Sequence, residues 1–93
     1  MICVKINRNI TTVNRTIHTN RKIEYLVIHY VGAFGNAEQN SKYFKDVNRR
    51  ASAYYFVDQK GVWQVVEDKD ASWHCGDAGS GEYKGVCRNA NSI

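Results

Sequence analysis

A chain of 93 residues holds one small domain and buries only about two-thirds of the surface that its unfolded form exposes. With 43% hydrophobic and 12% aromatic residues, the composition is that of a globular protein and excludes a disordered one. The net charge of +4 is modest and its cations are scattered, which disfavours a nucleic-acid-binding protein and suits contact with an anionic polymer.

The first residues lack the basic segment and long apolar run of a secretory signal peptide, so we expect synthesis in the cytoplasm. No apolar run approaches the ~18 residues of a membrane span, which disfavours a membrane partner. Three cysteines, Cys3, Cys75 and Cys87, allow at most one internal disulfide. The sequence leaves open whether Cys75 and Cys87 pair.

The first part of the chain predicts one strand and a long connection. Apolar residues alternate over residues 2–6, which predicts a short strand with one buried face. Residues 7–22 are rich in Asn, Thr and Arg and show no period. We expect them to cross the surface with Val13 and Ile17 partly buried.

The most hydrophobic run in the chain is residues 23–32, which read Ile-Glu-Tyr-Leu-Val-Ile-His-Tyr-Val-Gly. A run that is apolar on both faces predicts a strand buried on both sides, in the middle of a sheet. His29 lies near the end of this run. Its ring either points into a cleft at the sheet edge or is a core histidine bonded to a backbone carbonyl.

The spacing after this run predicts an amphipathic helix over residues 36–48. Asn36 can cap its first turn, and Gln39 stands at the capping-box position three residues later. One face of the helix would carry the apolar residues Ala37, Tyr43, Phe44 and Val47.

A hairpin follows, with strands at residues 53–57 and 62–67 joined by a turn at residues 58–61. Residues 78–91 form a polar, glycine-rich stretch that is too long for a simple connection, and it is a candidate functional loop. These elements, a buried central strand, one helix and a hairpin, predict an α/β chain. A central strand needs cover on both faces, and only one long helix is predicted.

Five blocks of sequence occur in the order seen in the zinc-dependent N-acetylmuramoyl-L-alanine amidases. The blocks are residues 23–32, 51–58, 61–66, 71–76 and 91–93, and the last of them reads Asn-Ser-Ile. The chain resembles this family, whose relatives are the peptidoglycan recognition proteins and whose members include phage endolysins and prophage amidases. The resemblance spans nearly the whole chain.

The resemblance implies a mixed α/β fold, with a central mixed β-sheet flanked by helices. It also implies a zinc hydrolase that cleaves the amide between N-acetylmuramic acid and the L-alanine of the stem peptide. The expected partner is peptidoglycan, met at the cell wall after release from the cell. The histidine that ends the central strand is the first Zn2+ ligand in the family, which corresponds to His29. The other ligands and the catalytic glutamate are expected beyond Ile93. We therefore expect residues 1–93 to be the N-terminal portion of a single catalytic domain, inactive alone.

Substrate contacts are implied for Trp73 and His74, which match a Trp-His-Ala-Gly block lining the groove, with Cys75 in the alanine position. Tyr54 replaces a histidine that is common in the family. It is a candidate for substrate contact and a weaker one for acid–base catalysis, against ordinary cross-strand packing.

Two alternatives stay open at this stage. One is a peptidoglycan-binding module that keeps the fold without catalysis. Another is a compact zinc site made from His29, His74 and either Cys75 or Cys87. We also expect that an exposed sheet edge can bring copies together as a homo-oligomer.

Overall fold

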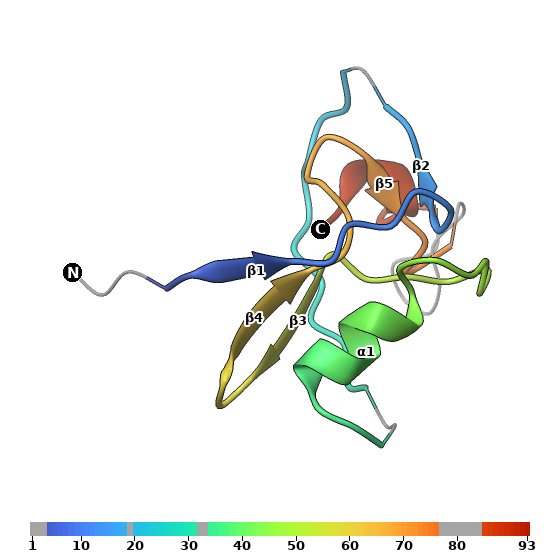
Figure 1. The fold of residues 1–93 in the computed structure, drawn as a ribbon. Helices are drawn as coiled ribbons and strands as arrows, with labels where there is room; N and C mark the ends of the chain where they lie inside the picture. The colour runs from blue at the N-terminus through green and yellow to red at the C-terminus, as the bar shows by residue number, and fades with distance from the viewer. Residues whose placement is uncertain (1–3, 19, 32–33, 77–84) are drawn as a thin grey trace.

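A three-stranded mixed sheet with one α-helix beside it forms the middle of the molecule (Figure 1). In this computed structural model, residues 4–18, 20–31, 34–76 and 85–93 are described. Strand β4 (Gly61–Gln64) pairs in parallel with β1 (Ile6–Arg8) and antiparallel with β3 (Tyr55–Asp58). Helix α1 (Ala37–Tyr43) packs on β3 and β4. The predicted mixed α/β class is confirmed.

A second, two-stranded sheet lies above the first in the view of Figure 1. Strand β2 (Arg15–Thr16) pairs antiparallel with β5 (Ala71–Ser72), and the 3-10 helix η2 (Asn89–Asn91) packs on β5. Strand β2 lies inside the stretch that we expected to be an irregular connection. Within that stretch the buried residues are Thr11 and Asn14, whereas Val13 and Ile17 are exposed, so that part of the expectation is wrong.

The predicted hairpin is confirmed, and Asp58 joins its turn to the start of α1. One carboxylate oxygen, Oδ1, accepts hydrogen bonds from the N–H groups of Lys60 (2.8 Å) and Gly61 (3.1 Å). The other, Oδ2, accepts from the N–H of Ala37 at 2.9 Å. These bonds hold the pKa of Asp58 below its usual range, and the bond from Ala37 has the largest effect on that pKa.

Helix α1 begins where the sequence predicts and ends earlier. Asn36 caps the first turn and exchanges capping-box bonds with Gln39. The helix stops at Tyr43, short of residue 48, because the following carbonyls of Phe44 and Val47 bond to the side-chain amide of Asn14 instead. None of the helices in the described ranges is long and apolar enough to cross a bilayer.

The predicted central strand at residues 23–32 is wrong for the residues that the structure describes. Residues 23–31 are extended but make a single bridge, between Tyr25 and Ser92. Backbone bonds add to it, from Val27 N–H to Ile93 O (2.6 Å) and from Ile93 N–H to Tyr25 O (2.9 Å). The apolar side chains of this run are left in solvent, with exposed fractions of 76% for Leu26, 90% for Ile28 and 96% for Tyr30.

The reason for this difference is the lack of neighbours. Residues 91–93 pair with one edge of the run, and no described strand pairs with its other edge. A strand is buried on both faces only when layers pack on both. The first strand also differs from the prediction of residues 2–6, because β1 begins at Ile6 and Val4 lies outside it.

Candidate active site

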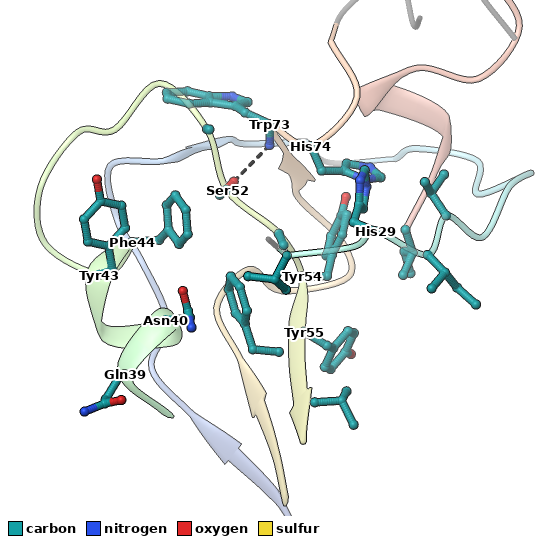
Figure 2. Close-up of a pocket in the computed structure, with 18 of the residues that line it drawn as sticks. His29, Gln39, Asn40, Tyr43, Phe44, Ser52, Tyr54, Tyr55, Trp73 and His74 are labelled. Atoms are coloured by element: carbon teal, nitrogen blue, oxygen red, sulfur yellow. Dashed lines mark hydrogen bonds between the residues drawn. The ribbon is translucent and has the colours of Figure 1, made fainter. Parts of the chain in front are cut away.

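A cavity of about 830 Å³ lies between the extended segment 26–31, helix α1, strand β3 and the loop that carries Trp73 and His74 (Figure 2). Its walls are mainly apolar and aromatic. A second cavity, of about 580 Å³, is lined by the segment 25–29 together with His74, Cys75 and Cys87. His29 and His74 line both cavities, so the two imidazoles stand where these spaces meet.

The imidazoles of His29 and His74 lie next to each other at this position, in an edge-to-face arrangement (Figure 2). The Nε2 atom of His29 lies 2.9 Å from the Nδ1 atom of His74, which is a hydrogen-bond distance. The ring centroids are 5.1 Å apart and the planes meet at 76°. The structure therefore brings together the predicted zinc ligand and a predicted substrate contact from segments far apart in the sequence.

His74 is held from several sides. Its Nε2 atom lies 2.9 Å from the hydroxyl of Ser92, and its ring meets the ring of Tyr54 edge-on at 5.5 Å. Its backbone N–H donates to the side-chain oxygen of Asn89 at 3.1 Å. Burial, and then the nearby positive charges of His29 and Arg21, lower the pKa of His74 to about 4, which the interaction with Ser92 partly opposes.

This shift predicts an acid-sensitive fold. His74 has an ordinary pKa of 6.5 and a folded value of about 4, so the unfolded state binds the proton more tightly. The free energy of unfolding of the metal-free chain should therefore fall between pH 6.5 and 4, by at most about 1.4 kcal/mol per pH unit for one proton. Urea titrations across this range measure it. His74→Gln should remove this part of the slope, and an unchanged slope in that variant would contradict the assignment.

The hydroxyl of Tyr54 is occupied by structural hydrogen bonds. It donates to the carbonyl of Asp70 at 2.6 Å and accepts from the N–H of Ser72 at 3.1 Å. The side chain is only 3% exposed, and burial raises its pKa. This arrangement favours a structural role for Tyr54 over a role in acid–base catalysis. Tyr54 also forms part of the wall of the larger cavity.

Trp73 is fixed beside the larger cavity by its neighbours. Ser52 bonds to both of its backbone groups, since the Ser52 hydroxyl accepts from the Trp73 N–H (2.9 Å) and the Trp73 carbonyl accepts from the Ser52 N–H (3.0 Å). The indole Nε1–H donates to the hydroxyl of Thr16 in β2 at 2.9 Å. The half-buried indole is thus held in place as part of the cavity wall.

The described residues match a zinc site in ligand type and not in ligand number. A catalytic zinc takes three protein ligands, and no group of three or more His, Cys, Asp or Glu side chains gathers within the described ranges. The compact site of His29, His74 and a cysteine is therefore not formed there. Cys75 and Cys87 are free thiols. The sulfur of Cys75 lies 3.9 Å from the Nε2 atom of His74, the same ring nitrogen that the hydroxyl of Ser92 contacts.

Sequence reasoning missed the residues that hold His74, chiefly Ser92 and Asn89. Ser92 lies within the Asn-Ser-Ile block and Asn89 just before it, so the position of this block in the family order was the available signal. Part of the predicted functional loop at residues 78–91, residues 78–84, lies outside the described residues. No acidic side chain from the described part lines either cavity.

The structure thus brings two imidazoles to the wall of a mainly apolar cavity, and such a cavity is the usual kind of ligand-binding site. The family model for N-acetylmuramoyl-L-alanine amidase matches residues 19–93, and the chain belongs to this family. No curated protein and no solved structure matches the chain. Membership connects the chain to amide hydrolysis in peptidoglycan.

Proposed function

We propose that this chain provides the substrate groove and the first zinc ligand of an amidase that cleaves the bond between N-acetylmuramic acid and L-alanine. The observation that carries the proposal is the pair of imidazoles, His29 and His74, 2.9 Å apart at the larger cavity of a chain in this family. The proposal includes action on the cell wall after release, as for a phage or prophage endolysin.

The larger cavity suits this substrate. Its volume of about 830 Å³ lies within the ~300–1,000 Å³ of typical ligand sites. Its apolar walls and the indole of Trp73 offer surfaces on which a sugar ring or an alanine methyl group can pack. The net charge of +4 favours approach to an anionic wall polymer.

The proposed role of His29 is to hold zinc through a ring nitrogen. A zinc ion there would act as a Lewis acid on the scissile carbonyl and make water a better nucleophile. Two further ligands and a carboxylate for proton transfer would come from outside the described residues. Because a partial ligand set binds zinc weakly, we propose that the 93 residues by themselves are inactive.

Purified peptidoglycan, incubated with zinc and this chain, tests the proposal. We expect no cleavage by the 93 residues alone. A longer product of the same reading frame, where the gene encodes one, should release stem peptides and create new L-alanine amino termini without new reducing sugar ends.

Each result separates the candidate functions. Cleavage by the 93 residues alone would show that the ligand set is already complete. Retention on peptidoglycan without cleavage by either protein would favour the binding module instead. Association of two copies through an exposed sheet edge stays a prediction. The large solvent-exposed side chains of residues 26–31 are consistent with it.

A further inference from the structure

The hydrogen-bond partners of Ser92 determine where its hydroxyl hydrogen points. This side chain is fully buried, so water does not compete for it. A serine hydroxyl has one hydrogen to donate and two lone pairs to accept with. The Ser92 oxygen lies 2.6 Å from the carbonyl oxygen of Arg88, and a carbonyl can only accept. Ser92 therefore donates its only hydrogen to Arg88.

The same oxygen must then accept from His74. It lies 2.9 Å from the Nε2 atom of that ring, and with its own hydrogen already committed it can bond there only as an acceptor. The contact from Ser92 to the sulfur of Cys75 is longer, at 3.5 Å, and does not compete with the carbonyl for the hydrogen. Neutral His74 therefore carries its proton on Nε2 and a lone pair on Nδ1.

We propose that Ser92 is a positioning residue that fixes the tautomer of His74 and so turns the Nδ1 lone pair toward His29. The 2.9 Å contact between the rings is then a hydrogen bond donated by His29 Nε2–H to His74 Nδ1. Because the His29 ring is exposed, its proton can move to its own Nδ1 when Nε2 is needed as a ligand.

The consequence for catalysis rests on the proposed function. If the Nε2 of His29 were used as a ligand instead, it could no longer donate this hydrogen bond, and the Nδ1 of His74 would be left as an acceptor that faces the cavities. His74 would then do more than contact substrate. The tautomer itself does not depend on the activity, so the two ideas can fail separately.

Nitrogen-15 NMR of the histidine-labelled 93-residue chain, metal-free at pH 7, tests the assignment. Two-bond proton–nitrogen correlations should show His74 as a single tautomer, with Nε2 at the upfield shift of a protonated nitrogen and Nδ1 at the downfield shift of an unprotonated one. Ser92→Ala should replace this pattern with a mixture of tautomers, and Ser92→Thr, which keeps the hydroxyl, should restore it.

Controls come from the same chain. Ser41, also fully buried, bonds to Glu38 and Asn9 and not to His74, so Ser41→Ala should leave the His74 pattern unchanged. A proton on Nδ1 of His74 in the unaltered chain would overturn the proposal, even if Ser92→Ala fails to fold. An unchanged pattern in folded Ser92→Ala would overturn it too.

Discussion

Replacing His29 with alanine should reduce cleavage of peptidoglycan about 1,000-fold or more in the active form of the protein. Lewis-acid assistance supplies several kcal/mol of transition-state stabilisation, and about 1.4 kcal/mol corresponds to each factor of ten. Loss of the first ligand removes that assistance. The measurement is the rate at which new L-alanine amino termini appear, with zinc content determined on the same samples.

His18→Ala is the matched control for this experiment. His18 lies outside the residues that line either cavity, and its backbone N–H bonds to Asp70, a contact that the substitution leaves in place. The control should keep its rate and its zinc. Equal rates for His29→Ala and the unaltered protein would contradict the assignment of His29 as a ligand.

Asn14→Ala should lower the free energy of unfolding by about 3 kcal/mol. The fully buried side chain of Asn14 donates to the carbonyls of Phe44 and Val47, both at 2.7 Å, and accepts from the N–H of Arg49 at 2.7 Å. These bonds are partly buried, and each hydrogen bond lost costs about 0.5–1.5 kcal/mol. Small domains have only about 5–15 kcal/mol in total, so this variant should lose a substantial part of its stability.

Urea unfolding followed by tryptophan fluorescence measures this loss. The control is Asn20→Ala, at an exposed asparagine, which should change stability by less than about 0.5 kcal/mol. If Asn14→Ala unfolds at the same urea concentration as the unaltered chain, then the three hydrogen bonds do not hold the loop after α1 as the structure indicates.

Local signals in the sequence predicted the elements that depend on neighbouring residues. The capping box of Asn36 and Gln39 fixed the start of α1, and the turn at residues 58–61 fixed the hairpin. In both places the side chains that decide the structure lie within a few residues of the backbone groups that they bond. The family order of blocks then indicated which residues to expect at the site.

Structural features that depend on residues far apart in the sequence could not be predicted from local signals. The end of α1 is decided by Asn14, which lies far earlier in the chain. The apolar run at residues 23–32 predicted a strand buried on both faces, but pattern alone does not say whether neighbours are present on both sides, and the described part of this run is largely exposed. The contact between His29 and His74 depends on how two segments far apart in the sequence are brought together in the fold, which no local pattern predicts.

The tripeptide 91–93 holds both imidazoles through different atoms. Its backbone, at Asn91 and Ile93, bonds to residues 24–27 just before His29, and the hydroxyl of Ser92 between them bonds to His74. A displacement of this tripeptide would therefore act on the backbone support of His29 and on the side-chain support of His74 at once. The relative position of the two imidazoles therefore depends on one short segment that supports both.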